Sequence, residues 1–167
     1  GLAVSARSQP RFTADVDLVV AVSDDAQAER LIRDLRQRSW RIDALIEQEA
    51  THRLATVRLL DDVDSTPVVD LLFASSGLEP EIVAAADVLE VFSAQRIPVA
   101  VVGHLIALKL LARDENRPQD DVDLRALVAV AGAEDVATAR VAVDLIQRRG
   151  FARRRDLHAA LANLVNR

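Results

Sequence analysis

The sequence of 167 residues predicts an α/β (α+β) fold, in which a mixed β-sheet with flanking helices is followed by a C-terminal helical bundle. Valine-rich runs with the alternation typical of strands occur up to about residue 102, and helical periodicities separate them. From residue 103 onward every segment has helical periodicity. Hydrophobic residues make up 50% of the chain and charged residues 28%, so the chain can bury a core and is not disordered. We therefore expect an α/β core over residues 1–102 and a helical region over 103–167 that packs on it.

The first half should contain strands with short helices between them. Residues 1–9 are expected to form a short helix, and residues 15–22 a strand, because apolar and polar residues alternate there and valine is frequent. Ser23 or Asp24 is a suitable cap for an amphipathic helix over residues 25–38. The other predicted elements are strands over 41–47, 53–60 and 67–73, of which the last two form a hairpin, a short helix after Pro80, and one or two strands over 89–101.

The second half should consist of helices separated by glycine and proline breaks. They are predicted over residues 103–114, 118–131, 134–149 and 155–166. The longest apolar stretch, residues 98–112, is too short to span a membrane and contains His104 and Lys109, so we expect no membrane contact. The sequence has no cysteine, which excludes disulfides and cysteine-based zinc sites and indicates the reducing cytoplasm. The formal net charge of −5 argues against a protein that coats long stretches of nucleic acid.

Three carboxylates stand in or beside strand-like apolar runs. Asp15 and Asp17 are two residues apart in a predicted strand, so their side chains leave the same face. Asp70 interrupts the apolar run VVDLLF, where an ionised carboxylate is costly unless it is paired with a cation. Carboxylates on neighbouring strands repel one another unless a divalent cation lies among them, and such oxygen ligands suit Mg²⁺ or Mn²⁺. The alternatives are that Asp15 and Asp17 lie at an exposed strand start and that Asp70 forms a salt bridge with an arginine.

This arrangement resembles the motif of the polymerase-beta type nucleotidyltransferase superfamily. That motif has Gly-[Gly/Ser], a gap, then Asp-h-[Asp/Glu]-h with h an apolar residue, and a third acidic residue on a later strand. Here Gly1 would be the second small residue, Asp15-Val16-Asp17-Leu18 the pair and Asp70 the third acid. The first glycine would lie before Gly1, so we expect residues to be missing there. The resemblance runs from residue 1 to about residue 128.

Within that superfamily, the stretch GLAVSARSQPRFTADVDLVV is most similar to the AbiEii toxin branch. In this branch Arg-x-[Thr/Ser]-x-Asp precedes the acidic pair, and Arg11 and Thr13 fill those places. The same branch carries a helix with a lysine and a later helix with Asp-x-x-Asp-Leu. Lys109, which is the only lysine of the chain, matches the first, and Asp120 and Asp123 match the second.

The resemblance implies a metal-dependent nucleotidyltransferase that transfers NMP from an NTP to a hydroxyl of RNA, such as tRNA, or of a protein. It would be the toxin-like component of a toxin–antitoxin or abortive-infection system, restrained by a cognate antitoxin. Its cofactor would be Mg²⁺ or Mn²⁺, with two ions on Asp15 and Asp17 and Asp70 on the ion nearer the acceptor. The implied catalytic residues are Asp15, Asp17, Asp70 and Asp123. The implied nucleotide-binding residues are Gly1, Ser5, Arg11, Thr13, Lys109, Arg113 and Asp120.

Lys109 and Arg113 are four residues apart, so on one helix they would share a face and repel each other. An anion between them, such as a triphosphate, would relieve this repulsion. The alternative is a pair of salt bridges to Asp120 and Asp123.

Two other functions remain open. The chain could be a catalytically weak nucleotide-binding or antitoxin-interacting module on the same fold, or a structural domain whose acids are only salt-bridged. The arginines around Gly150, from Arg148 to Arg155, could contact RNA or form a solvated helix end.

Overall fold

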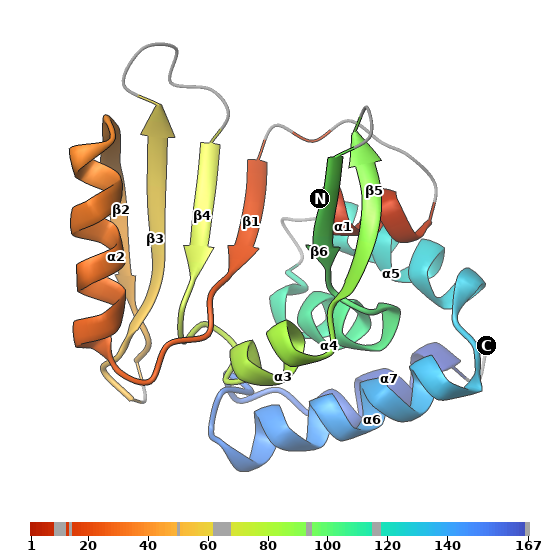
Figure 1. The fold of residues 1–167 in the computed structure, drawn as a ribbon. Coiled ribbons are helices and arrows are strands. Elements are labelled where there is room, and N and C mark those ends of the chain that lie inside the picture. Colours follow the sequence, from red (N-terminus) through yellow and green to blue (C-terminus); the bar gives the residue numbers. More distant parts are fainter. Residues whose placement is uncertain are drawn as a thin grey trace.

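The computed structural model describes residues 1–8, 13, 15–49, 51–61, 68–92, 95–114 and 118–165, and its mixed α/β architecture confirms the predicted fold class. A twisted sheet lies on one side of the molecule, and most of the helices gather on the other (Figure 1). The elements are α1 (Leu2–Arg7), β1 (Asp15–Val19), α2 (Asp25–Gln37), β2 (Trp40–Glu47), β3 (Leu54–Asp61), β4 (Val68–Leu72), α3 (Glu79–Ala84), β5 (Asp87–Phe92), β6 (Gln95–Val99), α4 (Val102–Ala112), α5 (Pro118–Val130), α6 (Ala133–Arg148) and α7 (Leu157–Val165).

The main sheet has the strand order β1-β4-β3-β2. β1 pairs with β4 in parallel, whereas β4 with β3 and β3 with β2 are antiparallel, so the sheet is mixed. The predicted hairpin of β3 and β4 is therefore present. The strand predicted over residues 15–22 ends earlier, at Val19, because the chain then turns toward the start of α2.

Helix α2 covers one face of this sheet. Asp24 caps it by accepting a hydrogen bond of 2.8 Å from the Gln27 N–H, which satisfies one of the unpaired donors of the first turn. Its buried residues Ala28 and Ile32 pack against a cluster of strand side chains. The buried strand residues of this cluster are Val57, Leu59, Val69, Leu71 and Phe73. The apolar positions of the strands thus point toward α2.

The larger core lies among the helices. α4 is buried nearly all round, from Val102 to Leu111, because α5, α6 and α7 surround it. Val4 of α1 and Ile82 of α3 belong to the same buried cluster. The second sheet, β5 with β6, is antiparallel and is attached to α1 by Arg7, whose guanidinium donates to the Val99 and Ala100 carbonyls at 2.9 and 3.0 Å. Residues on both sides of position 102 therefore share one core.

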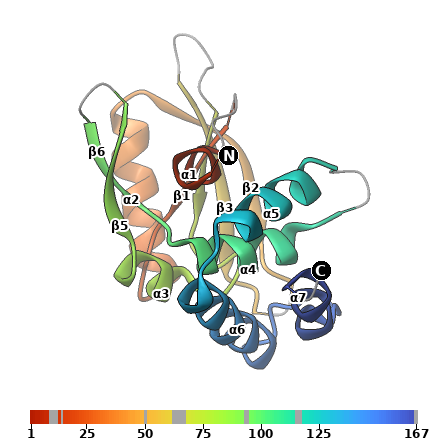
Figure 2. The same cartoon turned by 90° about the vertical axis from the view of Figure 1, so that its right-hand side faces the viewer.

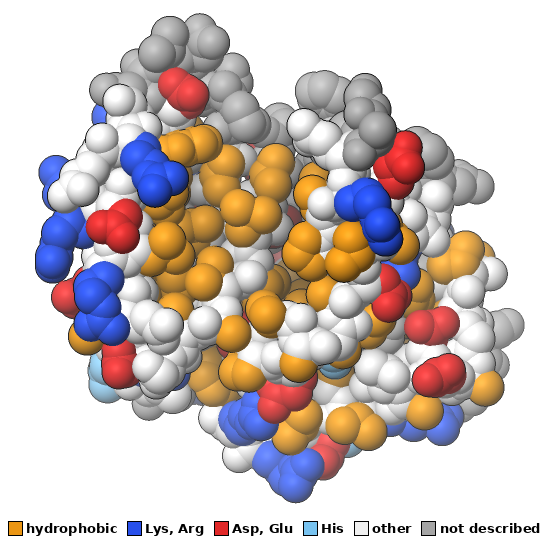
Figure 3. Space-filling view, in the orientation of Figure 1, with side chains coloured by type: hydrophobic (Ala, Val, Ile, Leu, Met, Phe, Trp, Pro, Cys, Tyr) orange, Lys and Arg blue, Asp and Glu red, His pale blue; other side chains and the backbone are white. Residues whose placement is uncertain are grey.

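Two further views show the surface and the position of α1. In Figure 2, turned by 90°, α1 is seen almost end-on in front of the main sheet. In Figure 3, hydrophobic side chains gather over the centre of the face between α2 and the helices, and most Lys and Arg side chains lie toward its margins. Within the described residues, no helix has the length and apolar character needed to cross a membrane.

The buried His104 on α4 leads to a prediction about pH. Only 6% of its surface is exposed, and this burial lowers its pKa from 6.5, an effect that the Glu81 charge only partly offsets. Because the unfolded chain then takes up this proton more readily than the folded one, stability should fall as the pH drops below about 6.5 toward the folded pKa. Urea unfolding at pH 7.5 and 5.5 measures the loss, and His104→Gln should lose less. An identical pH dependence in both proteins would contradict this role of His104.

Candidate functional site

The three predicted metal ligands lie on two neighbouring strands. Asp17 on β1 is in register with Asp70 on β4, so both side chains leave the same face of the sheet. Asp15 lies two residues before Asp17 on β1 and therefore shares this face. The alternate positions, such as Val16 and Val69, pack against α2 on the other side. The three carboxylates thus lie on the sheet face that α2 leaves uncovered.

The N-terminal end of the described chain borders this face. The Gly1 nitrogen lies 3.9 Å from Asp17 Oδ2, and the Asp17 side chain is 51% exposed. The Thr13 hydroxyl donates to the Asp15 carbonyl at 3.0 Å, and a Cβ on Gly1 would collide with that hydroxyl oxygen. Ser5 lies one turn along α1, where its N–H donates to the Gly1 carbonyl. Gly1, Thr13 and Asp17 are thus close together, whereas the predicted Arg11 lies outside the described residues.

Asp70 has a strong partner of its own. Arg58 on β3, which is in register with it, donates from Nε to Oδ1 at 2.8 Å and from Nη2 to Oδ2 at 2.7 Å. The Asp70 side chain is 12% exposed and that of Arg58 42%. The hydrogen bond and the negative charge of Asp70 raise the pKa of Arg58 above its usual value. Both oxygens of the third carboxylate are therefore engaged by a guanidinium.

These residues fit a divalent ion in type and in sheet position. Carboxylate oxygens are the ligands that Mg²⁺ and Mn²⁺ prefer, and Asp15, Asp17 and Asp70 share one face. Among the side chains that the structure describes, however, no three acids or histidines are gathered closely enough to hold a metal. Asp70 would have to exchange its contact with Arg58 to join such a site.

A second cluster joins α4 to α5. Lys109 Nζ lies 2.8 Å from Asp120 Oδ1 and 2.8 Å from Asp123 Oδ2. Both aspartates are 1% exposed, and the Gln119 side chain donates to Asp123 Oδ1 at 3.0 Å. Lys109 therefore forms the salt bridges that the sequence left open as an alternative to a triphosphate contact.

α4 ends at Ala112 instead of continuing to residue 114, and Arg113 is its C-cap. The Arg113 N–H still donates to the Lys109 carbonyl, one turn back, at 2.9 Å, and the chain leaves the helix after this residue. Its Nε lies 2.6 Å from Asp121 Oδ1, an ion pair in which both side chains are about half exposed. Each basic residue thus has its own acidic partner on α5, which removes the repulsion predicted between them.

Comparison with known proteins decides the family. The family model described as "Nucleotidyl transferase AbiEii toxin, Type IV TA system" matches residues 1–166. The chain belongs to the AbiEii family. Among solved structures, this AbiEii chain is similar to an antigenic nucleotidyltransferase-like protein from Paracoccidioides brasiliensis, with 17% identity, a TM-score of 0.47 and coverage of 96% of this chain and 80% of that chain. No curated protein matches it. The AbiEii chain is accordingly a nucleotidyltransferase of a toxin family.

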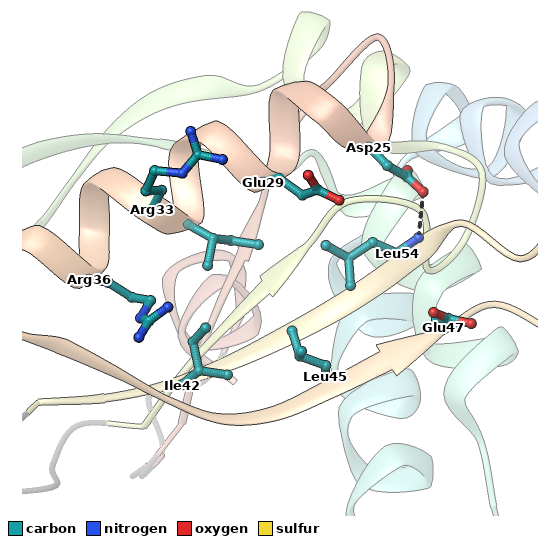
Figure 4. A pocket seen from close by; sticks show the side chains of 9 residues that line it. Asp25, Glu29, Arg33, Arg36, Ile42, Leu45, Glu47 and Leu54 are labelled. Atoms are coloured by element: carbon teal, nitrogen blue, oxygen red, sulfur yellow. Dashed lines mark hydrogen bonds between the residues drawn. The ribbon is translucent and has the colours of Figure 1, made fainter.

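The AbiEii chain has a pocket of about 500 Å³ elsewhere, between α2 and β2. Figure 4 shows charged side chains of α2, such as Glu29 and Arg33, above Ile42 and Leu45 of β2. None of the predicted site residues lines it. A second pocket, of about 410 Å³, includes Arg113 at the ends of α4 and α5. Neither pocket contains the acidic face of the sheet.

Some arginines of the basic cluster of the AbiEii chain, at residues 148–155, form contacts within the fold. Arg149 donates to both carboxylate oxygens of Glu81, at 2.7 and 3.0 Å, and this pairing raises the pKa of the arginine. Arg153 and Arg154 are exposed and have positive φ angles of 51° and 61°. The cluster therefore contains an ion pair that joins the end of α6 to α3, and an exposed turn at Arg153 and Arg154.

Sequence reasoning did not single out Arg58. The alternation of the strand over residues 53–60 and the predicted hairpin contained the signal, because antiparallel pairing brings one residue of that strand opposite Asp70. Only the register of β3 with β4 identifies that residue as Arg58.

Proposed function

We propose that this AbiEii nucleotidyltransferase is metal-dependent and transfers NMP from an NTP to a hydroxyl of RNA, such as tRNA, or of a protein. The observation that carries the proposal is the register of Asp17 with Asp70 and the common face that they share with Asp15. A structural domain would have no need to collect three carboxylates on the face that its flanking helix leaves open, because like charges there repel one another.

The residues of this face have distinct proposed roles. Asp15, Asp17 and Asp70 would hold Mg²⁺ or Mn²⁺. The ion, when bound, would neutralise phosphate charge, lower the pKa of the attacking hydroxyl and stabilise the pyrophosphate leaving group of an in-line displacement. Asp17 is half exposed and can receive a ligand without losing a strong protein contact. Gly1, Ser5 and Thr13 would border the phosphates, since Gly1 and Thr13 lie next to the acidic strand.

Helix α1 links the two clusters of the proposed site. It contacts β1, which carries Asp15 and Asp17, and it also contacts α4 and α5, which carry Lys109 and its aspartates. We propose that Lys109 and Arg113 bind the triphosphate from this side and that Asp120 and Asp123 hold the lysine in place. Asp123 would act in catalysis through the charge and position of that lysine.

The family description also supports a biological setting. A type IV toxin–antitoxin system implies a cognate antitoxin, and we propose that this antitoxin restrains the enzyme. We propose that the enzyme acts in the cytoplasm, where NTP and acceptor are both present.

The transferase activity can be tested directly. The purified chain is incubated with each labelled NTP, Mg²⁺ or Mn²⁺, and total RNA or total protein, and the label is followed on gels. We expect one NTP to label one of these acceptor pools and EDTA to abolish the labelling, because the carboxylates need the ion to bind phosphate. Labelling that persists in EDTA would contradict metal dependence, and no labelling with any NTP would contradict transfer.

A catalytically weak nucleotide-binding module on the same fold is the second candidate. The observation that favours it is the pairing of Asp70 with Arg58, which keeps the third carboxylate away from a common metal site. Calorimetric binding of an NTP without transfer to any acceptor would identify this function instead.

A further inference from the structure

Arg58 stands in one row with the proposed metal ligands. It is in register with Asp70 on the next strand, and Asp70 is in register with Asp17. The three side chains therefore lie across β3, β4 and β1 on the same face of the sheet. The charge of Asp15 also acts on the Arg58 guanidinium and favours its protonated form. The positively charged guanidinium of Arg58 therefore lies on the same sheet face as the three carboxylates.

The contact between Arg58 and Asp70 is specific in geometry. Two parallel N–H···O bonds, of 2.8 and 2.7 Å, occupy both carboxylate oxygens, and such a fork is stronger and more directional than a single ion pair. A guanidinium next to a metal ligand opposes the binding of a divalent cation in two ways. It uses the lone pairs that the metal needs, and its positive charge repels the ion.

The two partners differ in their freedom to move. Asp70 is 8% exposed and lies in the middle of the sheet, so its carboxylate would be left without compensation if nothing replaced Arg58. Arg58 has a long side chain that is 42% exposed and can turn toward water without losing its own hydration. An arriving divalent ion can therefore exchange with the guanidinium, whereas Asp70 can stay in place.

We propose that Arg58 is a positioning residue of the transfer site, which holds Asp70 through both oxygens and competes with the divalent ion for that carboxylate. The proposal rests on the proposed function, because it needs Asp70 to be a metal ligand. It explains why the acidic face forms no three-carboxylate cluster among the described side chains. A purely structural ion pair would hold β3 and β4 together and would leave metal affinity unchanged.

The affinity of the nucleotide-free chain for Mn²⁺ distinguishes a residue that competes with the metal from a purely structural ion pair. It is measured from the electron paramagnetic resonance signal of free Mn²⁺. Arg58→Gln should bind Mn²⁺ about tenfold more tightly than the wild type, because a competing charge within a few ångströms is gone. Arg58→Lys keeps the charge but cannot bind both oxygens, so its affinity should rise by only about threefold. Arg41→Gln removes the same charge from the neighbouring edge strand and should change the affinity by less than about twofold.

The transfer assay adds a second readout. In Arg58→Gln the Mn²⁺ concentration for half-maximal transfer should fall, while kcat also falls because Asp70 is no longer held. Unchanged Mn²⁺ affinity in Arg58→Gln, with an active wild type, would overturn the role of Arg58 and leave the transferase proposal intact. If neither protein binds Mn²⁺, the role of Arg58 fails, and the transferase proposal fails with it if the wild type also shows no EDTA-sensitive transfer. If Arg58→Gln does not fold, Arg58→Lys decides, and wild-type affinity in that variant overturns the proposal.

Discussion

Lys109→Met should destabilise the folded protein by about 3–5 kcal/mol, the cost of removing one partner from a buried ion pair. Its ammonium compensates Asp120 and Asp123 at 2.8 Å each, and both aspartates are 1% exposed. Methionine keeps the aliphatic stem but removes the ammonium that lies between the two buried carboxylates. Urea unfolding of the wild type and the variant at pH 7.5 measures the difference.

Two further variants show that charge compensation is the cause. Arg113→Met removes a half-exposed partner of Asp121 and should cost less than about 1 kcal/mol. Adding Asp120→Asn and Asp123→Asn to Lys109→Met should recover much of the lost stability, since the two buried negative charges that the lysine faced are then gone. If Lys109→Met unfolds like the wild type but no longer binds NTP in calorimetry, the lysine serves the nucleotide and not the core.

Asp17→Asn should lower the rate of transfer by at least about a hundredfold, because even residues that only support metal ligands contribute 10- to 100-fold. The same change should leave the melting temperature of the metal-free protein unchanged or slightly raised. Asp17 is 51% exposed, and its removal relieves repulsion with Asp70 in the adjacent register position.

The matched control for this variant is Asp43→Asn. Asp43 is exposed on β2 of the same sheet, and its replacement should leave transfer unchanged. A marked loss of thermal stability in Asp17→Asn, measured without metal, would indicate that Asp17 is a structural ion-pair partner. Transfer at the wild-type rate would exclude it as a metal ligand.

Periodicity was sufficient to predict most of the secondary structure. The alternation over residues 15–22 placed Asp15 and Asp17 on one strand face, and the apolar run around Asp70 identified a neighbouring strand, as the pairing of β1 with β4 shows. The helix ends were less well predicted. Nothing in the sequence 103–114 marks Ala112 as the last helical residue, because the end depends on how Arg113 meets α5.

The partners of the charged residues could be predicted only in part. Lys109 stood out because it is the only lysine, and its aspartates were named as one alternative, but the packing of α4 on α5 determines that both bind it. No feature of the sequence distinguished Arg58 from the other arginines in this way. With 21 basic residues in the chain, composition cannot say which one faces Asp70, and that depends on the register of β3 with β4.

The core that α1 shares with the C-terminal helices has a consequence for synthesis. Val4 is 2% exposed, and α1 packs on α4 and α5, which follow it in the sequence only after the strands of both sheets. On a nascent chain, α1 therefore cannot be fully buried before α5 has left the ribosome. This order delays assembly of the proposed site, because Gly1 lies at the start of α1, beside Asp17.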